Sequence, residues 1–419
     1  MGSRTARAKF TSPFAPLNLS HDEVETVDNL SRVILRNYVA QFEAFERGSG
    51  GVVDERVWKH LRTREGVRAY VERRKHSERN AGDLRRLTES YVGSGAVAPP
   101  DLPVLLITGS IPGTLDDLMY GLMGSTTDEV RVRTSYIGDL MTDTAVLATL
   151  ATPTQEDPFL SLTIRWEHHE TGQGILRMAV SDRDFVVMER MGLAFTSSGE
   201  RIGFYLLHSV HFPQTSELPG LVRGNATACA MFRFNSITNQ LDVFVRAITD
   251  ARGSMMHFAV AHATAETYTS ISRFTECGYR KKLMWRLRQT RKASGSVSSS
   301  TATASDDQRD SAPAQCALCG TTPTFSAKWL LSGGRLRTCA LCGKRVCTSC
   351  RIKKTLSQVT SSSGKLEQHR FSFCCACYSD VCRSGAMAIA QAEAANDSKQ
   401  AVESFSNWSD GMSSSVSSE

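Results

Sequence analysis

Eight cysteines in one short segment have the residue type and the spacing of metal ligands. They form four Cys-x2-Cys pairs: Cys316 and Cys319, Cys339 and Cys342, Cys347 and Cys350, and Cys374 and Cys377. A Cys-x2-Cys turn supplies zinc with two of its four tetrahedral ligands from one loop. Cysteines that only pack in a core have no need of this regular spacing. The segment therefore predicts two zinc ions per chain.

The gaps between the pairs indicate which pairs share a metal. Long gaps separate the first pair from the second and the third from the fourth, which favours a cross-braced arrangement. We predict one zinc held by Cys316, Cys319, Cys347 and Cys350, and another held by Cys339, Cys342, Cys374 and Cys377. Cys375 and Cys382 belong to none of these pairs, although Cys375 could replace Cys374 as a zinc ligand. Metal binding must supply the folding free energy of such short loops, about 10 kcal/mol per site.

The string from Arg335 to Cys350, RLRTCALCGKRVCTSC, resembles the core of a FYVE zinc finger. Arg345-Val346-Cys347 matches the Arg-Val-Cys motif of that family. The resemblance implies binding of phosphatidylinositol 3-phosphate on early endosomal membranes. Arg335 matches the first position of the family's basic motif around Cys339, but the two motif histidines that should immediately precede this cysteine are missing, as is the Trp-x-x-Asp motif ahead of Cys316.

Basic and apolar residues near these cysteines are candidates for membrane contact. From Cys316 to Arg383 the chain has eleven Lys or Arg residues and two acidic residues. Each basic residue near an acidic leaflet contributes roughly 1 kcal/mol. The candidate lipid-contacting residues are Arg335, Arg337, Lys344 and Arg345, with Trp329, Leu330 and Leu331 as a membrane-inserting turn; Arg351, Lys353 and Lys354 lie close by in sequence. In the alternative interpretation, the apolar triplet is a core strand and the charges are solvated.

The bulk properties restrict the class of protein. A chain of 419 residues predicts two or three domains, and its net charge of +6 does not indicate a nucleic-acid partner. We expect no secretory signal and no membrane-spanning segment. The expected location is cytoplasmic, with reduced thiols and peripheral attachment to endosomal membranes.

Hydrophobic periodicity predicts the elements that precede the cysteines. Helical patterns cover about 22–45 and 54–87, a buried strand covers 102–107, and Thr114 should cap a short helix. A long helix with a basic end should begin near 258. Strand patterns cover 130–137, 145–152, 160–166, 175–180, 185–191, 201–211, 227–234 and 241–247. We predict an α+β fold, an antiparallel sheet with a long helix across it and a ligand cavity between them.

The run Arg183-Asp184-Phe185-Val186 resembles a strand of START lipid-transfer domains, and the order of elements over residues 100–290 is similar. This resemblance implies the helix-grip fold and a hydrophobic lipid pocket. We expect Arg183 and Asp184 to form a buried or half-buried pair within the sheet; the alternative is a polar contact to the lipid in the cavity. We also expect His168 and His169 to mark the end of a strand, because neighbouring residues on a strand face opposite ways and cannot readily share a metal.

The predicted organisation has five parts. A polar lead-in covers 1–20, a START-like domain with a helical extension covers 21–292, and a Ser-rich linker covers 293–314. A FYVE-like finger covers 315–383, and a short helix with a Ser-rich tail covers 384–419.

No catalytic motif is found, so we predict a lipid-binding adaptor that is not an enzyme, with one lipid in the START-like cavity and an acidic membrane lipid at the finger. One alternative is a scaffold that binds a small GTPase, as FYVE-related fingers without the lipid-binding histidines can do. The other is a ubiquitin ligase with a RING-like cross-brace, which usually includes a histidine ligand that this chain lacks.

Overall fold

The computed structural model describes residues 10–73, 102–138, 140–170, 181–253, 255–293, 315–322, 336–360 and 363–397. The chain divides into two compact units. Of the described residues, those within 10–278 and 386–397 form the sheet unit, and those within 279–385 form the finger unit. The boundary at 278 falls within one helix, α6 (Phe274–Ala293).

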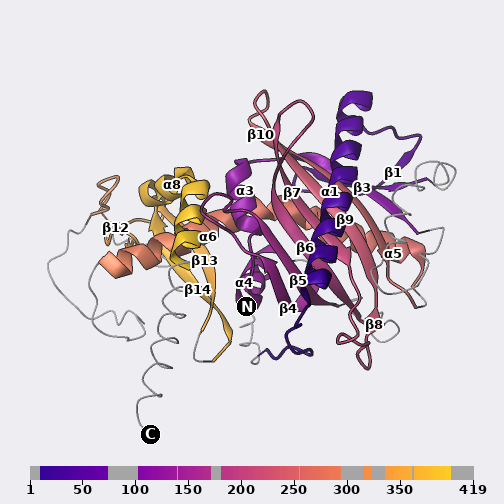
Figure 1. Ribbon diagram of the computed structural model, residues 1–419. Coiled ribbons are helices and arrows are strands. Elements are labelled where there is room, and N and C mark those ends of the chain that lie inside the picture. Colours follow the sequence, from indigo (N-terminus) through magenta and orange to yellow (C-terminus); the bar gives the residue numbers. More distant parts are fainter. Residues whose placement is uncertain are drawn as a thin grey trace, which may run out of the picture. The chain divides into compact units, whose positions relative to one another are not determined.

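The sheet unit contains, among its described residues, one ten-stranded sheet (Figure 1). Its strands are β1 (Trp58–Arg64), β2 (Val67–Glu72), β3 (Val104–Ile111), β4 (Met141–Ala151), β5 (Ser161–His169), β6 (Arg183–Phe195), β7 (Arg201–Ser209), β8 (Val222–Arg223), β9 (Asn225–Asn235) and β10 (Gln240–Asp250). The spatial order is β1-β2-β3-β10-β9-β7-β6-β5-β4. Neighbours along this order are antiparallel, and β8 pairs in parallel with the start of β6.

Helix α1 (His21–Ser49) covers one face of the sheet (Figure 1). It begins with a capping box between Ser20 and Glu23 and ends at Gly50, which has φ 59°. This is the left-handed conformation that glycine adopts without strain at a helix end. Its apolar stripe, Val27, Ile34, Tyr38 and Phe42, belongs to the core that includes Ile164, Trp166, Met188 and Phe204 of the sheet.

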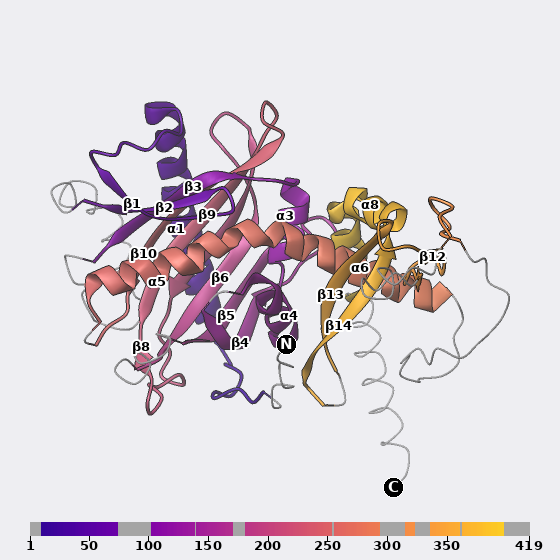
Figure 2. The same cartoon turned by 180° about the vertical axis from the view of Figure 1, so that it is seen from behind.

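The opposite face of the sheet is covered by α5 (His257–Thr269), the short 3-10 turn η2 (Ser270–Arg273) and the start of α6 (Figure 2). Helix α3 (Leu115–Leu122) meets α6 backbone to backbone. A Cβ atom on Gly121 would lie 2.0 Å from the carbonyl oxygen of Phe274, and one on Gly278 would lie 2.1 Å from that of Asp117. Glycine is therefore required on both helices at this crossing.

The predicted α+β class, with an antiparallel sheet and a long helix across it, is confirmed, as is the short helix capped by Thr114. Two local predictions are wrong. Part of the stretch predicted as a helix over 54–87 forms the β1–β2 hairpin, because Glu65 and Gly66 have φ of 48° and 87° and make a tight two-residue turn. Residues 74–101 and the strand predicted at 175–180 lie outside the described residues.

The second error concerns the predicted strand 130–137, which is part of helix α4 (Thr127–Ile137). Its local signals are those of a helix. Thr126 and Glu129 form a capping box, and Gly138 ends the helix with φ 64°. Alternation of apolar and polar residues over a few positions was the weaker indicator here.

In the finger unit, the described strands are β11 (Arg337–Thr338), β12 (Arg345–Val346), β13 (Arg351–Val359) and β14 (Leu366–Cys374), followed by α8 (Cys375–Arg383). The hairpin β13–β14 packs against the C-terminal part of α6 (Figure 2). The shared core consists of Leu283, Leu287, Leu356, Phe373 and Val381. The finger unit thus uses apolar residues of α6 that precede the first cysteine pair by about thirty positions.

Lys282 of α6 fixes the same helix to the end of α8. It is fully buried, and its ammonium group donates hydrogen bonds to the carbonyl oxygens of Cys382 at 2.7 Å and Ser384 at 2.8 Å. A cation stabilises the C-terminus of a helix, where carbonyl groups lack helical partners.

After the finger unit, residues 386–397 are helical and belong to the sheet unit. The Tyr120 hydroxyl donates to the Glu393 carboxylate at 2.9 Å. None of the helices in the described part of the chain has the length and hydropathy needed to cross a bilayer.

Candidate metal centres and ligand cavity

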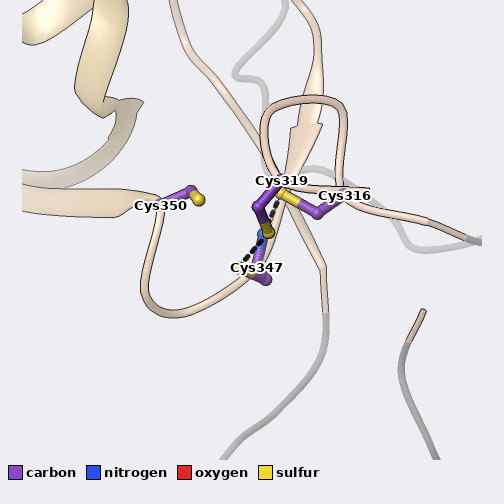
Figure 3. Close-up of side chains that lie close together, drawn as sticks. All are labelled: Cys316, Cys319, Cys347 and Cys350. Atoms are coloured by element: carbon purple, nitrogen blue, oxygen red, sulfur yellow. Dashed lines mark hydrogen bonds between the residues drawn. The ribbon is translucent and has the colours of Figure 1, made fainter. Parts of the chain in front are cut away.

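The structure brings the eight paired cysteines together in two sets of four. One set is Cys316, Cys319, Cys347 and Cys350, and the other is Cys339, Cys342, Cys374 and Cys377. Within each set the sulfur atoms all lie within 4.8 Å of one another. Figure 3 shows the first set, with Cys316 and Cys319 on one loop and Cys347 and Cys350 on another. These are the two groupings that the cross-braced arrangement predicts.

The spacing of the sulfur atoms fits zinc. Zinc–thiolate bonds of ~2.3 Å in a tetrahedron place neighbouring sulfur atoms about 3.8 Å apart. The sulfur atoms of Cys319 and Cys347 are 3.7 Å apart, and those of Cys342 and Cys374 are 3.9 Å apart. Each set could therefore hold one metal ion such as zinc, in a closed structural site with four protein ligands.

Two similar loops position the first pair of each set. The amide of Gly320 donates to the carbonyl oxygen of Cys316, and the amide of Gly343 donates to that of Cys339, at 2.9 and 3.0 Å. Both glycines have φ 70°, a conformation strained for other residues. The Cys-x2-Cys-Gly sequence thus encodes a turn that places both sulfur atoms on one side.

Backbone amides also point at the sulfur atoms. Cys347 N–H donates to Cys316 Sγ at 3.4 Å, and Cys374 N–H donates to Cys339 Sγ at 3.3 Å. Burial opposes ionisation, but backbone hydrogen bonds outweigh it and lower the pKa of Cys316 to about 6 and that of Cys339 to about 7. Zinc binds the thiolate form, so each cluster contains a thiol already disposed toward that form.

The structure places only some of the predicted lipid contacts. Trp329, Leu330, Leu331 and Arg335 lie outside the described residues. Arg337, Lys344 and Arg345 are exposed in and beside β11 and β12. In the register of these strands Arg345 pairs with Thr338. Because neighbouring residues alternate between faces, Arg345 and Arg337 lie on opposite sides of this two-stranded sheet.

A cavity of about 50 Å³ lies in the sheet unit, between the sheet and the helices α5 and α6. Its apolar wall includes Leu207, Ala228, Ala230 and Val245 of the sheet and Ile271 of η2. The lining also includes the charged residues Arg133, Arg165 and Glu167. A cavity of this size accommodates about one or two water molecules, and sites for small-molecule ligands are roughly 300 to 1,000 Å³.

The charged residues of the lining belong to a buried ion-pair network. Glu189 pairs with Arg133 at 3.0 Å and with Arg165, and Arg165 also pairs with Glu167. His169 Nε2 lies 2.8 Å from a Glu167 oxygen. Arg165 is 1% exposed and Glu189 is fully buried. Buried charges are stable only when paired, so the network is a unit whose members depend on one another.

Ionisation in this network follows from the pairing. Burial raises the pKa of Glu189, but Arg133 and Arg165 outweigh it and hold that pKa below its usual value. The pKa of Glu167 is likewise lowered, by Arg165 and His169 against burial. Burial raises the pKa of Tyr205, whose neutral hydroxyl donates to Glu189. Two carboxylates and two guanidinium groups thus remain charged beside the cavity.

Sequence reasoning did not find this network. The detectable signal was the Arg165-Trp166-Glu167 run, in which charged residues alternate with an aromatic residue inside a strand. Ile164 and Trp166 belong to the core beneath α1, so Arg165 and Glu167 must face the other way.

Two other sequence expectations can be assessed. Arg183 and Asp184 are both buried but do not pair with each other, contrary to prediction. Asp184 pairs with Arg223 at 2.8 Å and accepts a hydrogen bond from Trp166. Arg183 instead donates to carbonyl oxygens, including that of Ala251, because adjacent strand residues face opposite ways. His168 and His169 end β5, as expected.

Comparison with solved structures finds similarity to START-type lipid-transfer proteins. Human STARD10 gives a TM-score of 0.37 at 12% identity, over 59% of this chain and 82% of that chain. Human StAR-related lipid transfer protein 5 gives a TM-score of 0.36 at 15% identity, over 57% of this chain and 98% of that chain. A STAR-related lipid transfer protein fragment from Xanthomonas axonopodis gives a TM-score of 0.35 at 15% identity, over 53% of this chain and 98% of that chain. No family model and no curated protein sequence matches the chain. The fold described above therefore rests on the geometry of the sheet and its helices.

Proposed function

We propose that this protein is a non-enzymatic, lipid-binding adaptor. In this proposal the sheet unit encloses one lipid, as START domains do. The finger unit, a FYVE-type finger with two zinc ions held by the eight cysteines, binds phosphoinositide membranes. Phosphatidylinositol 3-phosphate is the head group that the motif resemblance implies, which would place the protein on endosomal membranes.

The observation that carries the lipid-binding part is the cavity beneath α5. One part of its wall is apolar, and another part is formed by Arg133, Arg165 and Glu167, which belong to the network around Glu189. An amphiphile has the same two parts, an apolar body and a polar head that requires hydrogen-bonding partners when it is buried. Binding requires the cavity to enlarge, and the 3-10 turn η2 between α5 and α6 is the point where the covering helix is interrupted.

Lipid binding by the sheet unit can be tested by filling the cavity. Ala230 of β9 lines it, so Ala230→Trp should abolish the lipid that copurifies with the full-length chain or is taken up from vesicles, measured by mass spectrometry. Ala226 is half-buried on the same side of β9 but does not line the cavity, so Ala226→Trp is the matched control. Uptake that survives Ala230→Trp in a folded protein would contradict a lipid site in this cavity.

Membrane binding by the finger unit is tested by flotation of the zinc-loaded chain with vesicles. The vesicles carry phosphatidylinositol 3-phosphate, phosphatidylserine or neutral lipid only. Arg345 occupies the Arg-Val-Cys motif and is exposed, so Arg345→Ala should reduce selective binding to the 3-phosphate. Lys365, an exposed residue beside the β13–β14 turn, provides the control Lys365→Ala. No flotation with any acidic vesicle would refute the membrane role and leave a protein-binding scaffold.

A further inference from the structure

The β13–β14 hairpin has one apolar and one cationic face. Alternate residues of a strand point to opposite faces. Leu356 and Phe373 lie on the face that packs against α6 and α8. Arg351 and Lys353 of β13 and Arg370 of β14 take the alternate positions and lie on the other face. In the strand register Lys353 is opposite Ser372 and Thr355 is opposite Arg370, so Lys353 and Arg370 are diagonal neighbours.

Arg337 of β11 adds a fourth positive charge close to these three residues. The residue that follows Cys339 ties this part of the chain to the hairpin, because the Ala340 amide donates to the carbonyl oxygen of Ser372 at 2.9 Å. The charges are close enough to affect one another. Arg337 and Arg370 are electrostatic neighbours of Arg351, and Arg351 is one of Lys353.

No carboxylate neutralises this group within the described chain, where none of the four residues makes an ion pair with an acid. Glu367 of β14 belongs to the opposite face and contacts His369 at 3.2 Å. Arg351 Nε is buried and lacks a hydrogen-bond partner among the described residues. Like charges that are neighbours on one face of a sheet repel and are destabilising, so this group of four favours a bound anion.

We propose that Arg337, Arg351, Lys353 and Arg370, the cationic hairpin face, bind an inositol head group that carries more than one phosphate. This inference rests on the proposed membrane role of the finger unit and not on its specificity for the 3-phosphate. It names the binding face and replaces the head group that the motif resemblance implies with one that carries more phosphates. Arginine pairs with phosphate oxygens through two parallel hydrogen bonds. A phosphomonoester carries about −1.5 to −2 charges near neutral pH, so four cations match two such groups better than one.

The residues of the cationic hairpin face do not favour binding of a nucleic acid. Proteins that bind single strands combine basic grooves with aromatic side chains on which bases stack. In the strand register this face comprises Arg351, Lys353, Thr355, Ser357 and Val359 of β13 and Leu366, Gln368, Arg370, Ser372 and Cys374 of β14, none of them aromatic. Phe371 and Phe373 belong to the packed face. Recognition here is restricted to phosphate groups.

The test uses the full-length, zinc-loaded chain and vesicles matched in total charge. They contain phosphatidylinositol 4,5-bisphosphate, phosphatidylinositol 3-phosphate or phosphatidylserine, and inositol hexakisphosphate serves as the soluble ligand. We expect at least tenfold tighter binding to the bisphosphate vesicles than to the other two. The double variant Lys353→Gln, Arg370→Gln should lose this preference. The matched control is Lys354→Gln, Arg383→Gln, since Lys354 lies over the Tyr378 ring and Arg383 is exposed on α8.

Each outcome decides a specific point, provided that zinc content and thermal stability match wild type in both double variants. Equal weakening by the two double variants would reduce the effect to general charge and overturn the proposal. Preference for the 3-phosphate that the Lys353, Arg370 variant retains would overturn it while leaving the proposed membrane function intact. Binding of the soluble hexakisphosphate without binding of vesicles would support the phosphate site and refute its membrane source. Equal competition by RNA would overturn the head-group assignment.

Discussion

Replacing Glu189 with glutamine removes the central charge of the buried network beside the cavity. The side chain is fully buried and contacts the guanidinium groups of Arg133 and Arg165 and the hydroxyl of Tyr205. Glutamine has nearly the same volume and still accepts hydrogen bonds. Glu189→Gln therefore tests the electrostatic contribution of this carboxylate and leaves the packing of β6 almost unchanged.

The expected loss of stability is large because two desolvated cations lose their shared partner. Two unit charges about 4 Å apart interact with about 4 kcal/mol at an effective dielectric constant of 20. Breaking a buried pair by removing one partner costs about 3 to 5 kcal/mol in proteins. We therefore expect Glu189→Gln to lower the free energy of unfolding by about 3 to 5 kcal/mol. Asp116→Asn is the control, since Asp116 and Arg201 form a partly exposed pair worth less than about 1 kcal/mol.

Urea unfolding followed by circular dichroism and by tryptophan emission measures both variants. The dependence on pH gives a second check. The pKa of Glu189 is lowered in the folded state, so its stabilising effect is present above the unfolded pKa and is lost as pH falls. The difference between wild type and Glu189→Gln should therefore narrow in acid. A difference below about 1 kcal/mol at neutral pH, or one that does not change in acid, would refute the buried ion-pair assignment.

Three further predictions concern other parts of the chain. Cys339→Ser should reduce bound zinc from two ions to one per chain in elemental analysis, whereas Cys375→Ser should leave two, and an unchanged count in Cys339→Ser would contradict the ligand assignment. Leu287→Ala should destabilise the finger unit by about 2 to 5 kcal/mol in thermal unfolding, because the Leu287 side chain is buried in the core shared with the hairpin. A change below about 1 kcal/mol would show that this unit does not depend on α6. Gly121→Ala should lower the free energy of unfolding by about 3 kcal/mol or more, because its Cβ would meet a carbonyl oxygen of α6 at 2.0 Å. The control Gly48→Ala, in an open position of α1, should be neutral or slightly stabilising. Equal effects of the two substitutions would refute the close helix crossing.

Spacing along the chain predicted the two sets of four cysteines because each Cys-x2-Cys pair is a local unit. Only the choice of which two pairs share a metal had to be inferred. The α+β class was predictable for a related reason, since most strands carry their own periodic signal. The cap at Thr114 is also local. These features depend on residues that are close in sequence, and the structure agrees with them.

Features that depend on distant residues were not predictable in this way. The charge of Asp184 is neutralised by Arg223, thirty-nine positions later, and not by its neighbour Arg183. The Glu189 network joins α4, β5 and β6, and no single segment contains its pattern. The errors at β1–β2 and α4 have another cause, because turn and capping signals were present and were outweighed by apparent periodicity.

Strand alternation produces both the charged wall of the cavity and the cationic hairpin face. In β5 it directs Arg165 and Glu167 to the cavity and leaves Trp166 in the core beneath α1. In β13 it separates Lys353, on the cationic face, from Lys354, which lies over the Tyr378 ring. A run of basic residues in the sequence is therefore not one patch but two sets with different surroundings. It follows that charge-removing substitutions should be compared in pairs that differ by one strand position, since such pairs keep the net charge equal and change only the face that loses it.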